Sequence, residues 1–313
     1  MRAGIVCGDL TATVEFSFEA GGRAGTQAGV GEPPQNGGIV VVFDFDRTII
    51  DGDSDSWVVA EMGLSDLFNQ LRSTLPWNSL MGRMMKELHS QGKTAEEIAA
   101  CLKRTPLHPR IAAAIKSAYA LGCDLRIVSD ANQFFIEKIL EYQGLLACFS
   151  KIYTNPSFVD EEGRLRIFPY HDSTLSAHGC SLCPSNLCKG LVLDHIYASA
   201  PEGVRRNFIY LGDGRGDYCP TLRLQDSDYV MPRKKYPLWD RIFSEPALVK
   251  AEVHEWSNGE ELEKILLHLI DKIPTEQSIS GSNPSSQSNS SDCKLHISVS
   301  SPESFTQTLR VPH

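Results

Sequence analysis

The sequence contains no run of apolar residues long enough to cross a lipid bilayer as a helix, which takes about 20 such residues. Its first residues also lack the order of a secretory signal, in which a basic stretch precedes an apolar one. Basic residues are outnumbered by acidic ones, 30 against 39, so the formal net charge is −9 and no broad basic surface for nucleic acid or anionic lipid is expected. We therefore expect a cytoplasmic protein that binds neither nucleic acid nor membrane.

The cysteines lack the pattern of a secreted disulfide framework, because their number is odd and their spacing is irregular. A local group of His178, Cys180, Cys183 and Cys188 could hold a structural Zn²⁺. Only one Cys-x-x-Cys pair is present, however, and Cys188 directly precedes Lys189. Free thiols packed near a functional site are the preferred interpretation, and zinc binding stays open.

Composition separates a folded part from two extensions. Residues 1–37 are rich in glycine and other small residues, and 274–313 begin with a stretch dominated by Ser, Asn and Gln. We expect both extensions to be disordered. The folded part is then 38–273, in a chain that is 42% hydrophobic, which is enough for one core domain with a smaller satellite.

Strand and helix patterns alternate through most of the folded part. Short apolar runs predict buried strands, and amphipathic stretches with capping residues predict helices. The expected strands are 39–43, 125–128 and 208–211, and the expected helices are 109–121, 131–143, 188–199 and 259–271, the last with a capping box formed by Ser257 and Glu260. A hairpin is expected at 157–168, turning at 160–163. This alternation predicts an α/β fold with a doubly wound, mainly parallel sheet.

One stretch, 54–106, departs from the alternation because only helical patterns occur in it. Its Met and aromatic positions are typical of hydrophobic packing. An all-helical insertion after the first strand predicts a cap over the carboxyl edge of the sheet, where open α/β sheets bind ligands. The core domain would then comprise 38–53 and 107–273.

Two acids, Asp44 and Asp46, follow the first predicted strand directly. Carboxylates at the end of a buried strand are costly unless a cation pairs with them. One can act as a nucleophile while the other transfers protons. The alternative is a solvated acidic turn, because Asp51, Asp53 and Asp55 come soon after.

Three further elements favour a site. Ser129 follows the second predicted strand and could donate to a phosphoryl oxygen, although a helix cap is the ordinary role of such a serine. Lys189 begins a predicted helix, where its charge and free backbone N–H groups would face an anion. Asp213 and Asp217 follow the third strand in a glycine-rich turn and could bind a hard cation, unless the turn is an ordinary one.

Taken in chain order, these elements resemble the haloacid dehalogenase (HAD) superfamily. Its four motifs match Asp44/Asp46/Thr48, Ser129, Lys189 and Asp213/Asp217. More narrowly, the sequence resembles the phosphoethanolamine/phosphocholine phosphatase family, and within it the plant thiamine phosphate phosphatase-like and pyrophosphatase-like members. The segments that carry this closer resemblance are 44–55, 127–132, 180–190 and 212–220.

The resemblance implies a Rossmann-like core with a C1-type helical cap, and a phosphatase mechanism. Asp44 would attack phosphorus, and Asp46 would protonate the leaving oxygen and then activate water. A Mg²⁺ ion would be held by Asp44, the backbone carbonyl of Asp46 and Asp213, with Asp217 as a supporting acid. The residues implied to hold the phosphoryl oxygens are Thr48, Ser129 and Lys189.

The substrate is less well defined by the sequence. Asp55 and Asp130 could face the leaving group and would suit a cationic amine or choline head, which favours phosphocholine or phosphoethanolamine. Asp55 could instead only cap the first helix of the insertion, and Asp130 could be an acid at the start of a helix, where the helix dipole favours it. Inorganic pyrophosphate, thiamine monophosphate and pyridoxal phosphate are alternative substrates, and a catalytically silent phosphometabolite-binding protein is an alternative of another class. No role is assigned to Arg47, and the oligomeric state is left open.

Overall fold

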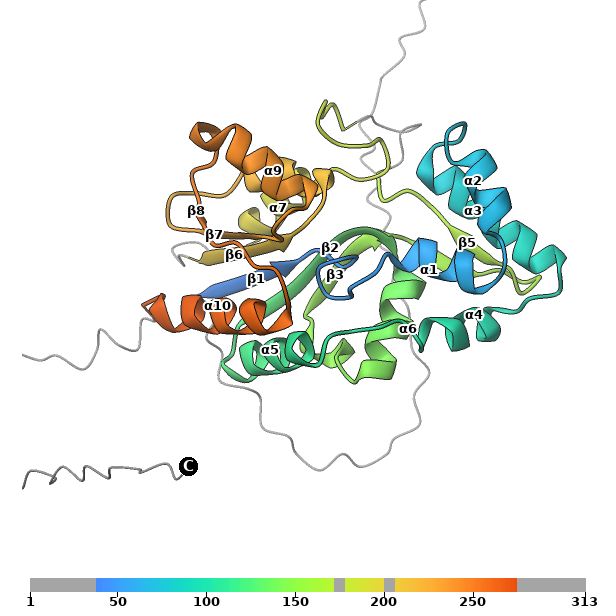
Figure 1. Cartoon of the computed structure of the whole chain (residues 1–313), viewed down its shortest axis with the longest axis horizontal. Helices are drawn as coiled ribbons and strands as arrows, with labels where there is room; N and C mark the ends of the chain where they lie inside the picture. Colours follow the sequence, from blue (N-terminus) through green and yellow to red (C-terminus); the bar gives the residue numbers. More distant parts are fainter. Residues whose placement is uncertain (1–37, 172–177, 200–205, 275–313) are drawn as a thin grey trace, which may run out of the picture. The chain divides into compact units, whose positions relative to one another are not determined.

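The computed structural model describes residues 38–171, 178–199 and 206–274 (Figure 1). We expect disorder in 1–37 and in 274–313. Except for Pro274, all of these residues lie outside the described ranges. No helix within the described ranges is both long and apolar enough to cross a membrane.

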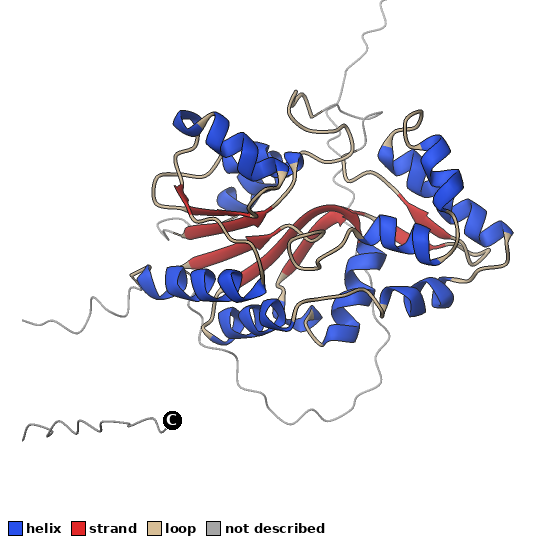
Figure 2. Cartoon of the chain, viewed as in Figure 1, coloured by secondary structure: helices blue, strands red, loops and turns tan. Residues whose placement is uncertain are grey.

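A six-stranded parallel sheet forms the centre of the fold (Figure 2). Its order is β3-β2-β1-β6-β7-β8, so the chain moves outward from β1 in one direction and then in the other. The strands are β1 Ile39–Phe43, β2 Asp124–Asn132, β3 Lys151–Asn155, β6 Asn207–Gly212, β7 Tyr229–Pro232 and β8 Glu252–Val253. The predicted doubly wound α/β fold is confirmed.

Side chains of β1 alternate between two hydrophobic clusters, one on each face of the sheet. Val41 and Phe43 belong to the cluster covered by α5 and α10, whereas Val40 and Val42 belong to the cluster covered by α7 and α9 (Figure 1). The helices outside the cap region are α5 Pro109–Ala120, α6 Gln133–Gln143, α7 Lys189–Ala198, α8 Tyr218–Thr221, α9 Pro237–Ser244 and α10 Gly259–Lys272, with short 3₁₀ turns η1 Leu146–Cys148, η2 Arg215–Asp217 and η3 Pro246–Leu248. Burial on both faces explains the unbroken apolar sequence of β1.

Between β1 and α5 the chain forms four helices and no strand. They are α1 Ser54–Glu61, α2 Ser65–Leu71, α3 Trp77–Ser90 and α4 Ala95–Leu102. The predicted hairpin is present as β4 Ser157–Val159 and β5 Leu165–Ile167, and β5 lies against α3. The structure thus confirms the helical content of 54–106, and we propose that these helices cap the sheet.

Two local predictions are corrected. The second strand does not end at 128 but continues to Asn132, with a register shift against β3, so α6 begins at Gln133. The capping box predicted from Ser257 and Glu260 is wrong. Asn258 caps α10 instead, because its Oδ1 accepts from the backbone N–H of Glu261, and Asn is as good a cap as Ser.

A core substitution in α10 tests this packing. Leu266 is fully buried, so Leu266→Ala removes apolar contacts and leaves a cavity. We expect the free energy of unfolding to fall by about 2 to 5 kcal/mol, measured by urea denaturation. Leu248→Ala is the control, because that side chain is 55% exposed and should change stability by no more than about 0.5 kcal/mol. Equal effects of the two substitutions would contradict the described core.

Candidate active site

The carboxyl ends of three parallel strands meet at one edge of the sheet. Phe43, the last residue of β1, pairs with Ile127 of β2 on one side and with Leu211 of β6 on the other. The backbone N–H of Asp44 donates to the carbonyl oxygen of Leu211 at 2.8 Å. The residues that follow these strands therefore converge, as expected for the ligand edge of an open α/β sheet.

A cavity of about 340 Å³ opens at this edge. Most of the predicted site residues line it, namely Asp44, Asp46, Asp55, Asp130, Lys189, Asp213 and Asp217. Thr48 and Ser129 do not line it and are fully buried. Ser129 Oγ accepts from the N–H of Ala131 at 3.2 Å, and the Thr48 hydroxyl has no hydrogen-bond partner in the described part of the chain. Phosphate binding by these two hydroxyls stays a prediction.

Lys189 is the buried cation at the centre of the acids. Its Nζ lies 2.8 Å from Asp44 Oδ1 and 2.8 Å from Asp217 Oδ1, and the residue is only 3% exposed. Burial alone would lower the pKa of Lys189, but the charges of Asp217 and Asp44 outweigh it and raise that pKa well above the ordinary value. Lys189 is therefore charged, and it stands at the first position of α7.

Asp217 has no carboxylate oxygen left for a ligand. Its Oδ1 accepts from Lys189 Nζ and from the Tyr210 hydroxyl, at 2.8 and 2.7 Å. Its Oδ2 accepts from the backbone N–H groups of Asp213 and Gly214, at 3.2 and 2.8 Å. The carboxylate thus orients both Lys189 and the turn that carries Asp213.

Among the described residues, the Asp44 carboxylate has Lys189 as its partner at Oδ1, and no group donates to the carboxylate of Asp213. Carboxylate oxygens of Asp44, Asp213 and Asp217 lie within 4.8 Å of one another. Burial raises the pKa of Asp44 well above the ordinary value, Asp217 adds to this effect, and Lys189 opposes it. Burial and Asp217 also raise the pKa of Asp213 to about 7. One lysine does not balance three buried acids, and the open oxygens are of the kind that hard divalent cations prefer, so this set fits Mg²⁺.

Asp46 is held differently. Its Oδ1 accepts from the backbone N–H of Ser54 at 2.8 Å, which ties it to the first residue of α1. Burial, followed by the charges of Asp53 and Asp55, raises the pKa of Asp46 well above the ordinary value. Burial raises the pKa of both acids, but their partners differ, because Asp44 faces the charge of Lys189 and Asp46 accepts from a backbone N–H.

Asp55 has a tryptophan partner that the sequence analysis missed. Trp77 Nε1 donates to Asp55 Oδ2 at 2.7 Å, and both residues line the cavity. Burial, with the nearby charge of Asp53, raises the pKa of Asp55 to about 8. Asp55 does not cap α1, because Asp53 does, although Asp55 lies in the first turn of that helix. The helix-start alternative for Asp130 is wrong, because Asp130 lies within β2. Nothing in the sequence pattern links positions 55 and 77, whose contact depends on the packing of α1 and α3.

Arg47, which the sequence left without a role, also lines the cavity. It has a left-handed backbone, with φ at 55°, and its guanidinium pairs with Asp53 at 3.1 Å. Arg215 lines the same cavity. The pocket thus contains two arginines in addition to Lys189.

The family follows from comparison of the sequence with known families. A model of the family described as Putative Phosphatase matches residues 39–270, which is most of the chain. The chain belongs to the Putative Phosphatase family. It is a phosphatase of the HAD type, which confirms the resemblance stated above.

Three relatives illustrate the range of this family. The chain is 61% identical over 240 residues to the thiamine phosphate phosphatase-like protein of Arabidopsis thaliana, covering 76% of this chain and 98% of the relative. It is 57% identical to inorganic pyrophosphatase 2 of the same plant, covering 85% and 95%. It is 33% identical to the pyridoxal phosphate phosphatase of Bos taurus, covering 74% and 98%.

A solved structure shows the same fold. It is a HAD family hydrolase from Salmonella enterica serovar Typhi, which matches with a TM-score of 0.51 and 18% sequence identity, over 77% of this chain and 73% of that chain. This fold is thus shared by two proteins of very different sequence.

Gly212 allows the close approach of Asp217 and offers a test of the site. A Cβ at position 212 would lie 2.6 Å from Asp217 Cγ, so Gly212→Ala must displace the carboxylate that orients Lys189 and Asp213. We expect phosphate release by this phosphatase to fall on the order of tenfold to a hundredfold, measured at saturating substrate. Gly82→Ala in α3, where a Cβ meets nothing within 4 Å, should leave the rate unchanged. A fully active Gly212→Ala variant would argue against this role of Asp217.

Proposed function

We propose that this phosphatase hydrolyses a small phosphomonoester through a phospho-aspartate at Asp44, with Mg²⁺ as its cofactor. The observation that carries the proposal is the pairing of two differently prepared acids in one cavity. Asp44 Oδ1 pairs with Lys189 Nζ at 2.8 Å, whereas Asp46 Oδ1 accepts from the backbone N–H of Ser54, and burial with the charges of Asp53 and Asp55 raises the pKa of Asp46. Such a division between two carboxyl groups assigns them different roles in catalysis.

The first step transfers the phosphoryl group to the protein. Asp44 attacks phosphorus while the bond between phosphorus and the leaving oxygen breaks, and Asp46 donates its proton to that oxygen. The leaving group departs as an alcohol. Asp46, now ionised, accepts a proton from water as the water oxygen attacks phosphorus, which releases phosphate and restores Asp44. A silent binding protein would have no need of a proton donor at Asp46.

The cation would be held by Asp44, the backbone carbonyl of Asp46 and Asp213, and Asp217 would support this set without direct contact. When bound, Mg²⁺ supplies positive charge that keeps the acids ionised and neutralises the phosphoryl oxygens. Lys189 adds a second positive charge, and free N–H groups at the start of α7 favour an anion. Thr48 and Ser129 are proposed to donate to the phosphoryl oxygens.

We propose a substrate whose leaving group carries a positive charge, such as phosphocholine, phosphoethanolamine or thiamine monophosphate. Asp55 and Asp130 line the cavity together with the indole of Trp77, which is 38% exposed. Acids and an aromatic face together are a typical environment for an organic cation. The name of the 61% identical relative, a thiamine phosphate phosphatase-like protein, is compatible with this class.

Inorganic pyrophosphate is the second candidate. Arg47 and Arg215 line the same cavity and could bind a second phosphate group. The 57% identical relative is named an inorganic pyrophosphatase. Pyridoxal phosphate, named for the relative of Bos taurus, remains a third possibility within the same mechanism.

Substitution of the two acids separates their roles. Asp44→Asn should abolish release of phosphate from every substrate, because an amide is not a nucleophile. Asp46→Asn should slow release from alkyl phosphates by about a hundredfold or more, and release from p-nitrophenyl phosphate far less, because nitrophenolate leaves without a proton. Steady-state assays with added Mg²⁺ measure both effects. Equal losses of Asp46→Asn on the two leaving groups would contradict its role as the acid.

Substrate choice is tested by Asp55→Asn. We expect kcat/KM for phosphocholine to fall on the order of tenfold relative to glycerol phosphate, which has a neutral leaving group. The pKa of Asp55 is about 8, so its charge, and with it the preference for the cation, should increase as the pH is raised from about 7 to about 9. The substitution should remove this pH dependence.

Asp66→Asn provides the control, because Asp66 is an exposed acid of α2 that does not line the cavity. It should change neither the ratio nor its pH dependence. If an assay of both substrate classes shows hydrolysis of pyrophosphate and of no phosphomonoester, pyrophosphate is the substrate instead.

A further inference from the structure

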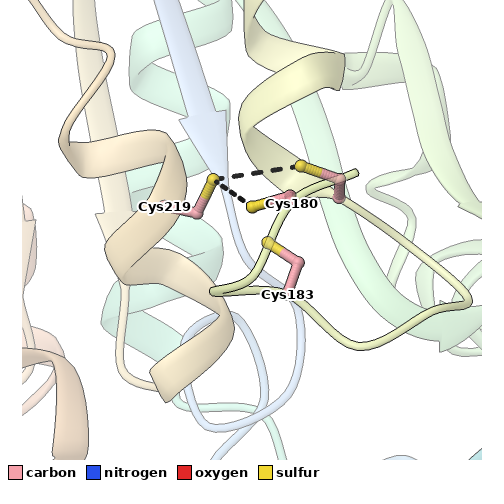
Figure 3. A group of neighbouring side chains, drawn as sticks. Cys180, Cys183 and Cys219 are labelled. Carbon is pink, nitrogen blue, oxygen red and sulfur yellow. Dashed lines mark hydrogen bonds between the residues drawn. The ribbon is translucent and has the colours of Figure 1, made fainter. Parts of the chain in front are cut away.

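Four thiols meet outside the cavity, in the segments next to Lys189 and Asp217. The Sγ atoms of Cys180, Cys183, Cys188 and Cys219 all lie within 4.8 Å of one another (Figure 3). Three come from the segment that leads into α7, and Cys219 comes from α8. His178, which the sequence grouped with the first three, is not in this cluster, and Cys219 takes the place expected for it.

The spacing of the sulfur atoms fits a single tetrahedral metal ion. Zn²⁺ binds thiolates at about 2.3 Å, and the sulfur atoms of such a tetrahedron are about 3.8 Å apart. Here Cys219 Sγ lies 3.6 Å from Cys180 Sγ and 3.9 Å from Cys188 Sγ. A disulfide needs about 2.05 Å, so these pairs are not disulfides. All seven cysteines in the described ranges are free thiols.

We propose that Cys180, Cys183, Cys188 and Cys219 bind one structural Zn²⁺. This inference goes beyond the proposed hydrolysis, because none of these thiols lines the catalytic cavity. Four soft ligands select zinc over magnesium, and a closed set of four leaves no position for water or substrate, as is typical of structural sites.

The loop is shaped by contacts that leave the thiols free. His178 Nδ1 accepts from the N–H of Cys180 at 3.1 Å, and its Nε2 lies 2.9 Å from the carbonyl oxygen of Pro184. His171 Nδ1 accepts from the N–H of Cys188 at 3.1 Å. Both histidines therefore fix the backbone of cysteine residues and present no nitrogen to the cluster. The thiols are brought together without using other ligands.

Gly190 lets the two halves of the cluster approach. A Cβ at this position would lie 2.5 Å from Cys219 Sγ, which is closer than van der Waals contact allows. Any other residue would push the thiol of α8 away from the segment before α7. The close approach of Cys219 therefore explains why glycine stands at the second position of α7, and the catalytic residues do not explain it.

Zinc at this position would join two parts of the active site. Cys188 directly precedes Lys189, and Cys219 follows Asp217 by two residues. Lys189 and Asp217 form the buried ion pair at 2.8 Å. A metal bound to the thiols would hold the start of α7 against the start of α8, and so would fix the distance that this ion pair requires.

The test measures metal content and ligand type in the full chain. The protein is produced with added zinc, dialysed against Mg²⁺ and a weak chelator, and analysed by elemental mass spectrometry. We expect about one zinc per chain in the wild type, and a fall to roughly a tenth or less in Cys183→Ser and in Gly190→Ala. Cys148→Ser, a half-buried thiol outside the cluster, should keep its zinc. Asp44→Asn should also keep it, which separates this proposal from the catalytic one.

Cobalt identifies the ligands without relying on a variant that folds. Wild-type protein reconstituted with Co²⁺ should show the near-ultraviolet thiolate-to-cobalt charge-transfer absorption, which carboxylate ligands do not give. Wild-type protein that retains no zinc and gives no such absorption would overturn the proposal. So would a thiol count showing the four cysteines as two disulfides, or full zinc in Cys183→Ser and Gly190→Ala.

Discussion

The structure depends on one buried cation placed between acids. Lys189 lies 2.8 Å from both Asp44 and Asp217, and these three side chains are almost completely inaccessible to solvent. Removing charged groups from water is costly, so such an arrangement persists only when each group has partners. Asp217 accepts four hydrogen bonds within the protein, whereas the one partner of the Asp44 carboxylate among the described residues is Lys189, at Oδ1. Asp44 is therefore available to a ligand, whereas Asp217 holds Lys189 and the turn that carries Asp213 in place.

The parallel sheet explains how segments that are distant in sequence meet around this lysine. Because β1, β2 and β6 run side by side in the same direction, their ends present acids and a hydroxyl along one edge. The helical insertion then adds Asp55 and Trp77 above that edge, and the packing of α1 against the site ties Asp46 to Ser54. In this proposal the acids that carry the reaction follow the strands of the sheet, and the inserted helices add two of the three residues that recognise the leaving group.

Much of this arrangement could be predicted from the sequence. The runs at β1, β2 and β6 are apolar because both faces of these strands are covered, and the acids that follow them are conspicuous for that reason. The strands β3, β7 and β8 are not predicted. The edge strand β3 begins with the exposed Lys151 and carries polar residues, β7 is only four residues long, and β8, at the other edge, is only two. Trp77 and Cys219 could not be assigned, because their partners are distant in sequence and only tertiary packing unites them.

The central claim is a covalent phosphoryl transfer to Asp44, and the stereochemical course at phosphorus tests it most directly. A phosphomonoester made chiral with sulfur and oxygen isotopes is hydrolysed in isotopically labelled water, and the configuration of the released thiophosphate is determined. Two successive in-line displacements, first by Asp44 and then by water, predict retention of configuration. Inversion would mean that water attacks the substrate directly, and it would contradict the account.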